Sequence, residues 1–278
     1  LFSENKIKHK VFNISDDLPQ NLDFIPRFEK ITNQLPAFFD LAISVDCGTY
    51  KRLGFELDSS IPLINFDHHK SNEKFGVVNI VDPMKSSTAE LVFEFFKHNG
   101  LYITKNSATA LYVGIYDDTL AFSLGRCDEL TFEKINFLVE CGASPSEIAN
   151  KLLRRDSLAK YRIIPKVLDS LELYKEGTVA SIVAREEWFK QTGAHNRDCE
   201  DALDMVMSIA IVKIAIFVRI VNGTSRVSLR SKGQIDVSKV AGKFGGGGHY
   251  NASGCTIDML DVEKAKEIVL KEIFEIYE

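Results

Sequence analysis

The chain has 278 residues, of which 45% are hydrophobic and 26% charged, and its net charge at pH 7 is −5. This length favours two domains, and the negative charge excludes a broad electrostatic attraction for long nucleic acid. No apolar run approaches the roughly 20 residues of a membrane helix, so no membrane partner is expected. The five cysteines are scattered without a CxxC pair, which argues against a zinc ribbon and fits a reducing, cytoplasmic location.

In the first half of the chain, strand-like apolar runs alternate with helical segments. The expected elements are strands over 41–45 and 63–66 and helices over 87–99, 105–116, 129–140 and from 144 onward. Ser87 and Glu90 have the spacing of a capping box, and Gly100 is placed to end that helix. Strands that alternate with helices indicate a doubly wound, mainly parallel sheet.

The pattern changes after residue 156. We expect a long connecting helix over 156–174, strands over 178–184, 211–221 and 225–231, and a final helix over 262–277. Asn222-Gly223 predicts a hairpin, and Asp236 predicts the cap of a short helix that runs into Phe244. The expected fold is α/β, with a parallel-sheet domain over 1–155, a helical linker over 156–176 and a smaller α/β domain over 177–278.

Acidic and histidine residues follow the expected strands and helices of the first domain. Asp46 ends one strand, Asp67-His68-His69 ends the next, and Asp118 follows a helix. In an open α/β sheet these are the positions where ligands bind. Carboxylates with imidazoles are a ligand set that suits Mn²⁺, Mg²⁺ or Fe²⁺, whereas a zinc site is typically richer in thiolates. Each residue alone reads more simply as a turn, a cap or a solvated side chain.

A run of four glycines stands near the carboxyl end of the chain, between Phe244 and His249. Ordering such a run costs conformational entropy, so close approach of the backbone to a ligand explains it better than a flexible linker does. Freed backbone amides can bind an anion, and an arginine with neighbouring hydroxyls is a forked phosphate donor. The candidate substrate-binding residues are Arg230, Ser231, Gly245, Gly246, Gly247, Gly248 and His249.

These motifs together resemble those of the DHH-superfamily phosphoesterases. The segments that carry the resemblance are Val45–Gly48, Asp67–Asn72, Gly114–Thr119, Ser228–Ser231 and Gly245–His249. They span most of the chain, end in the DHH-associated carboxyl-terminal domain, and are most similar to the nano-RNase and adenosine 3′,5′-bisphosphate (pAp) phosphatase branch. A larger RecJ-like exonuclease and a family II pyrophosphatase fit less well.

The resemblance implies a role for each matched position. Asp46 corresponds to a carboxylate that bridges two divalent ions, and His68 and Asp118 to ligands of the second ion. Asp67 corresponds to a carboxylate that supports the metal cluster, and His69 to the residue that contacts the scissile phosphate. Arg230, Ser231, His249 and the glycines correspond to the substrate-holding side of the second domain, which would face the metals across a cleft.

Two departures from the family pattern affect the metal centre. Asp117-Asp118-Thr119-Leu120 replaces the usual Thr-Asp-Thr-Gly, and we assign the ligand to Asp118. Nothing in residues 1–38 matches the family's first motif, which supplies three ligands of the first ion. The sequence therefore predicts that the chain starts inside the domain, that the first ion is not held, and that strand edges and apolar surface are exposed.

The resemblance implies an enzyme that uses two divalent ions, Mn²⁺ first among them, to hydrolyse short oligoribonucleotides and the 3′-phosphate of pAp. The alternatives are a cyclic-dinucleotide or linear-dinucleotide phosphodiesterase and, from another class, an inactive nucleotide-binding module. Expected partners are short oligonucleotides or pAp and no long nucleic acid, and a homodimer is compatible with this assignment.

Overall fold

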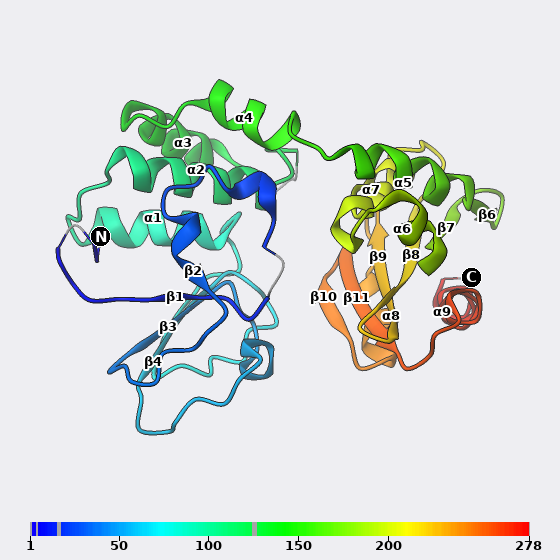
Figure 1. The fold of residues 1–278 in the computed structure, drawn as a ribbon, viewed down its shortest axis with the longest axis horizontal. Helices are drawn as coiled ribbons and strands as arrows, with labels where there is room; N and C mark the ends of the chain where they lie inside the picture. The colour runs from blue at the N-terminus through cyan, green and yellow to red at the C-terminus, as the bar shows by residue number, and fades with distance from the viewer. Residues whose placement is uncertain (1, 4, 16–17, 124–126, 278) are drawn as a thin grey trace. The chain divides into compact units, whose positions relative to one another are not determined.

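The computed structural model describes residues 2–3, 5–15, 18–123 and 127–277. The chain divides into two compact units, Leu1–Arg155 and Asp156–Glu278 (Figure 1). No sheet runs from one unit into the other, and each unit has its own buried core. Among the described residues, none of the helices combines the length and the apolar character that a membrane span requires.

The first unit is built on short parallel strands. Strands β3 (Ala42–Val45), β4 (Leu63–Asp67) and β5 (Val78–Val81) form a parallel sheet in the order β3-β4-β5, and β1 (Val11–Phe12) pairs in parallel with β2 (Ile31–Thr32). Short 3₁₀ helices cover Gln20–Leu22, Phe28–Lys30 and Tyr50–Leu53. Because β3 and β4 are parallel neighbours, the residues that follow them lie at one edge of the sheet.

The α-helices described in this unit gather on one side of the three-stranded sheet (Figure 1). They are α1 (Thr88–His98), α2 (Lys105–Asp118), α3 (Glu129–Glu140) and α4 (Pro145–Leu153). The Phe66 ring of β4 meets the Phe95 ring of α1 edge to face, with ring centroids 5.3 Å apart. Helices α1 and α2 then share a core that includes Phe93 and Ile115. This packing fixes the start of α1 and the end of α2 beside the sheet edge.

The second unit contains one six-stranded mixed sheet in the order β10-β11-β9-β8-β7-β6. Its strands are β6 (Glu172–Tyr174), β7 (Val179–Ala184), β8 (Ile214–Val221), β9 (Thr224–Ser231), β10 (Gly247–His249) and β11 (Ala252–Ile257). Strands β7 and β8 are parallel, and all other neighbours are antiparallel. The hairpin between β8 and β9 is confirmed: Asn222 and Gly223 both have positive φ, as a type I′ turn requires.

Helices cover both faces of this sheet. They are α5 (Leu158–Asp169), α6 (Glu186–Thr192), α7 (Asp201–Met207), α8 (Val237–Lys243) and α9 (Val262–Ile276), with a 3₁₀ helix over Asn196–Cys199. On one face α5 and α7 pack against Ile182 and Phe217. On the other face α8 and α9 pack against Ile216 and Leu229. Every residue of β7 is buried, because helices cover it from both sides.

The α/β fold with a parallel first sheet and a separate carboxyl-terminal sheet domain is confirmed. The long connecting helix is shorter than expected. Helix α5 ends at Asp169, and Glu172–Tyr174 pairs with β7 as strand β6. Ile163 and Val167 of α5 are fully buried in the core of the second unit, so α5 is an integral helix of that unit.

Candidate functional site

The polar residues that follow β3 and β4 meet at the carboxyl edge of the parallel sheet. Val45 pairs with Phe66, so Asp46 and Asp67 are the next residues along two neighbouring strands. The Asp46 amide donates to the Phe66 carbonyl at 2.9 Å, which ties the end of β3 to β4. Asp46 then takes a left-handed backbone conformation with φ of 58°.

Two helix ends supply the remaining contacts of this edge. Asp118 is the last residue of α2, and its Oδ2 lies 3.0 Å from His68 Nε2. Asp46 Oδ1 lies 3.7 Å from the same nitrogen. Thr88, the first residue of α1, donates its hydroxyl proton to Asp46 Oδ1 at 2.7 Å. The sheet edge and two helices thus place two carboxylates around one imidazole nitrogen.

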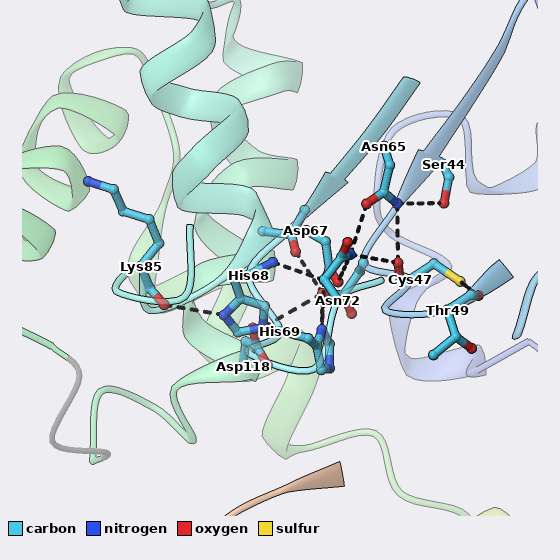
Figure 2. Close-up of polar contacts among 12 residues, drawn as sticks. Ser44, Cys47, Thr49, Asn65, Asp67, His68, His69, Asn72, Lys85 and Asp118 are labelled. Atoms are coloured by element: carbon cyan, nitrogen blue, oxygen red, sulfur yellow. Dashed lines mark hydrogen bonds and ion pairs between the residues drawn. The ribbon is translucent and has the colours of Figure 1, made fainter. Parts of the chain in front are cut away.

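The backbone fixes the orientation of the His68 ring. His68 Nδ1 lies 3.2 Å from the Lys85 carbonyl oxygen and donates to it, which leaves the Nε2 lone pair toward the carboxylates (Figure 2). The side chain is only 2% exposed. Burial lowers the pKa of His68, but the hydrogen bond and charge of Asp118 outweigh it, and the net pKa is raised. The two carboxylates therefore favour the protonated form of the ring.

Asp67 lies beneath this cluster and holds the second histidine. Its side chain is fully buried, and Oδ1 accepts from the His68 amide at 2.9 Å and from His69 Nδ1 at 2.6 Å. Asn72 donates to Oδ2 at 2.5 Å and also reaches Asn65 on β4 (Figure 2). Burial raises the pKa of Asp67, but the hydrogen bonds from His69 and Asn72 hold the net pKa below its usual range. Asp67 is therefore a buried carboxylate that orients His69.

The donor set fits a hard divalent ion. Asp46, His68 and Asp118 each offer one ligand atom, and these atoms lie within 4.8 Å of one another. Asp46, Asp67 and His69 form a second such group. Ring nitrogen and carboxylate oxygens are the ligands of Mn²⁺, Mg²⁺ and Fe²⁺, and the hydrogen bonds from Thr88 and to Lys85 are the kind of outer support that metal ligands carry.

In the second unit, the structure separates two neighbouring candidates. Arg230 and Ser231 are consecutive on β9, so their side chains lie on opposite faces of the sheet. The Ser231 hydroxyl donates to the Ile235 carbonyl at 2.6 Å and shares the buried face with Leu229. Arg230 Nε lies 3.5 Å from Asp204 on the other face. Ser231 is therefore not placed with Arg230, since strand alternation turns its side chain away.

The reason for glycine differs among the four positions of the run. Gly245, with φ of 69°, and Gly246 end α8 in a Schellman motif, donating to Gly242 and Ala241. A Cβ at Gly246 would lie 2.2 Å from the Gly254 carbonyl oxygen, and one at Gly248 would lie 2.5 Å from that of Ala252. A Cβ at Gly247 would meet nothing within 4 Å. Three glycines are thus needed by the turn and by β11, and Gly247 alone has no such need.

His249 ends β10, where it pairs with Ala252 of β11 and lies beside Gly248. Sequence reasoning missed three positions that these arrangements bring out: Thr88, which contacts Asp46, and Arg219 and Arg226, which share the sheet face of Arg230. A two-residue period counted back from Arg230 would have found Arg226. The position of Thr88 as the first residue after the Ser87 cap was a weaker signal.

Comparisons with known proteins agree with this architecture. Residues 5–115 match the model of the DHH family, N-terminal domain, and residues 176–277 match the DHHA1 domain. The chain is 28% identical over 262 residues to the bifunctional oligoribonuclease and PAP phosphatase NrnA of Thermus thermophilus, covering 93% of this chain and 78% of that protein.

Two further comparisons differ in how much of the other protein they cover. The chain is 30% identical over 220 residues to the cyclic-di-AMP phosphodiesterase PdeA of Listeria monocytogenes, covering 77% of this chain but 32% of that protein. The crystal structure of an exopolyphosphatase-related protein from Bacteroides fragilis superposes with a TM-score of 0.86 at 26% identity, over 99% of this chain and 85% of that one.

Proposed function

Since the chain belongs to the DHH family of phosphoesterases and carries the DHHA1 domain, we propose that it hydrolyses short oligoribonucleotides and the 3′-phosphate of pAp. The observation that carries this proposal is the convergence of Asp46, His68 and Asp118 at one sheet edge. The relative named for both activities matches 93% of the chain, through both domains. The match to PdeA covers a smaller part of that relative's length, so cyclic dinucleotides are the second substrate class to test.

Asp46, His68 and Asp118 would hold a divalent ion, for which we propose Mn²⁺. Such an ion supplies a positive charge for the phosphoryl oxygens and lowers the pKa of a bound water. The hydrogen bond from Thr88 orients the Asp46 carboxylate, and the Lys85 carbonyl keeps the proton of His68 on Nδ1. The family resemblance also implies a first ion that would share Asp46, but residues 1–38 contain no match to the motif that supplies its other ligands, so one ion is proposed here.

His69 is proposed to contact the scissile phosphate. The buried Asp67 carboxylate accepts from Nδ1, which fixes the tautomer and the orientation of the His69 ring. Asp67 therefore acts through His69 as a positioning residue.

Within the second unit, Arg230, His249 and Gly247 are proposed to hold a substrate phosphate. Arg230 offers a planar fork of donors, and its only carboxylate neighbour in the described chain is Asp204, half exposed at 3.5 Å. Gly247 lies on the outermost strand with open space where a side chain would be. A phosphate oxygen can therefore approach its backbone.

The test is turnover of pAp, a series of short oligoribonucleotides and cyclic di-AMP by the same preparation with Mn²⁺. We expect hydrolysis of pAp and of di- to tetranucleotides, and little turnover of cyclic di-AMP. Asp118→Asn should lower kcat by at least 100-fold and weaken Mn²⁺ binding measured by calorimetry. Hydrolysis of cyclic di-AMP alone would assign the second substrate class, and binding without turnover of any substrate would indicate an inactive nucleotide-binding module.

A further inference from the structure

Three arginines share one face of the sheet in the second unit. In the β8–β9 pair, Arg219 lies directly opposite Arg226, and Ser228 is the residue opposite Phe217, between Arg226 and Arg230 along β9. Residues two apart on a strand point to the same face, so Arg226, Ser228 and Arg230 lie in a row. The same face includes Gly254 on β11, which pairs with Ser228, and Gly247 on β10, which pairs with Gly254.

Arg219 is a buried guanidinium with more donors than acceptors. Its side chain is 8% exposed and lies over the Phe217 ring, 4.9 Å from the centroid. Nη2 donates to Glu200 at 2.7 Å and Nη1 to the Ser228 hydroxyl at 3.4 Å, while buried Nε has no acceptor among the described residues. Burial lowers the pKa of Arg219, and the charges of Arg226 and Arg230 act in the same direction.

Arg226 is exposed and forms no ion pair with any residue that the structure describes. Like charges directly opposite each other destabilise an antiparallel pair, and within the described ranges Glu200 is the one carboxylate that forms an ion pair with either of these two arginines. A Cβ on Gly254 would lie 3.9 Å from Arg226 Nη2, so this guanidinium extends over a strand that has no side chain there. The face is therefore exposed at Arg226, and in the Arg219–Arg226 pair only Arg219 has a carboxylate partner among the described residues.

We propose that Arg226, with Arg219 and Ser228 beside it, forms a second phosphate subsite on this face. Arg230 is four residues along β9, about 13 Å in backbone distance. The Arg219 guanidinium reaches Ser228, halfway between them, so the donors form a continuous row. The subsite takes the second phosphate of a short nucleotide whose first phosphate is at Arg230, and this assignment rests on the proposed function.

The test compares two ligands that differ by one phosphate. The dinucleotide ApA has a single internal phosphate, and pApA adds a terminal one. Binding is measured by calorimetry with the full chain in chelator, so that no hydrolysis occurs. We expect Arg226→Gln to weaken pApA binding about tenfold, because a charge-assisted fork is lost, and to change ApA binding less than about twofold. Arg226→Lys should be intermediate.

Lys271→Gln is the matched control, because it removes one positive charge from an exposed position on α9, which covers the opposite face. It should leave both affinities unchanged. Equal losses for pApA and ApA in Arg226→Gln, or no loss for either, would overturn the subsite. If the wild-type protein cleaves neither oligonucleotides nor pAp but the Arg226 effect on pApA persists, the proposed function fails and the subsite stands.

Discussion

At the residue scale, Asp46 combines backbone strain with side-chain support. Its φ of 58° lies in the left-handed region, which aspartate tolerates better than most residues. The Phe66 carbonyl holds the amide, and the Thr88 hydroxyl holds the carboxylate. Strain that neighbouring contacts maintain is typical of functional positions, because it keeps a side chain aimed where a relaxed chain would not.

Thr88→Val tests whether this support matters for metal binding. Valine keeps the shape but loses the donor to Asp46 Oδ1, so the carboxylate is no longer oriented. Loss of an outer hydrogen bond to a metal ligand costs about 10- to 100-fold in affinity. We expect Mn²⁺ affinity, measured by calorimetry, to fall within that range. Thr88→Ser keeps the hydroxyl and should bind Mn²⁺ nearly as well as the wild-type protein; equal affinity in all three proteins would exclude this role.

Single residues were predictable where the strand or helix end was clear. Asp46 and the Asp67–His69 segment stand directly after apolar runs, so their shared position at a sheet edge followed from the parallel order. The choice between Asp117 and Asp118 rested on family spacing, and in the structure it is Asp118 that lies 3.0 Å from His68. Ser231 shows the limit of a motif match. The motif does not take into account that successive side chains of a strand point to opposite faces of the sheet.

At the scale of elements, the start of α1 supplies several contacts of the candidate metal site. The Lys85 carbonyl accepts from His68, Ser87 caps the helix, and Thr88 donates to Asp46. Glu90 is buried and accepts from both the amide and the hydroxyl of Ser86, in place of the Ser87 amide that a capping box would use. This turn therefore depends on a buried carboxylate.

Lys134 of α3 balances the negative charge of the Glu90 carboxylate. Its ammonium contacts Glu90 and lies 2.6 Å from Glu94, which also pairs with Lys85 at 2.5 Å. Lys134→Met would leave Glu90 as a buried charge without a cation, and we expect a loss of about 3 kcal/mol in the free energy of unfolding at neutral pH, measured by urea titration. Lys134→Arg keeps the charge and should retain most of the stability.

The pH dependence of the loss gives an independent check. Burial raises the pKa of Glu94, but hydrogen bonds from Lys134 and Lys85 hold its net pKa below the usual value. A lowered carboxyl pKa stabilises the fold at neutral pH, and this stabilisation is lost as the pH falls through the folded-state pKa. The difference between wild type and Lys134→Met should therefore shrink below about pH 4.3. A constant difference down to pH 3 would rule out an electrostatic origin.

Two alanine variants distinguish a glycine that packing requires from a glycine that would contact a ligand. Gly246→Ala places a Cβ against the Gly254 carbonyl and Cys255, so it should destabilise the protein by about 2 kcal/mol. Gly247→Ala meets no atom within 4 Å and should leave the melting temperature nearly unchanged. If Gly247 approaches a phosphate, this second variant should still raise KM for pAp severalfold. Unchanged kinetics in Gly247→Ala would remove the glycine from the substrate site.

Elements with strong local signals were predictable, and elements fixed by tertiary pairing were not. The caps Ser87 and Asp236 and the Asn222-Gly223 turn lie where expected, because each acts through contacts within a few residues. Strand β10 is mostly glycine and has no apolar pattern. It exists because β11 pairs with it along Gly247–His249. The same holds for β6, whose three residues pair with β7.

At the scale of the whole molecule, the change from parallel to mixed sheets marks the two units. The alternation of strands and helices in the first half predicted the parallel order, since parallel neighbours need a crossover between them. The second unit could not be ordered from its sequence, because its central strands β7, β8 and β9 are joined by connections of different kinds, and β7 and most of β8 are covered on both faces. Burial on both faces removes the alternation that would show register.

The net charge leads to the last prediction, which concerns substrate length. A chain of charge −5 gains little from releasing counterions along a strand, so we expect the binding energy to come from a few contacts, such as those proposed for Arg226 and Arg230. With about two phosphates neutralised, the slope of log affinity against log salt should be about −1.4 for single strands. Turnover per chain end should be highest for di- to tetranucleotides and should not rise with added length. Initial rates for oligomers of increasing length measure the first quantity, and affinities at two salt concentrations measure the second.

A rate that climbs beyond about ten nucleotides, together with a much steeper salt slope, would require an extended basic surface. That result would contradict recognition confined to one or two nucleotides.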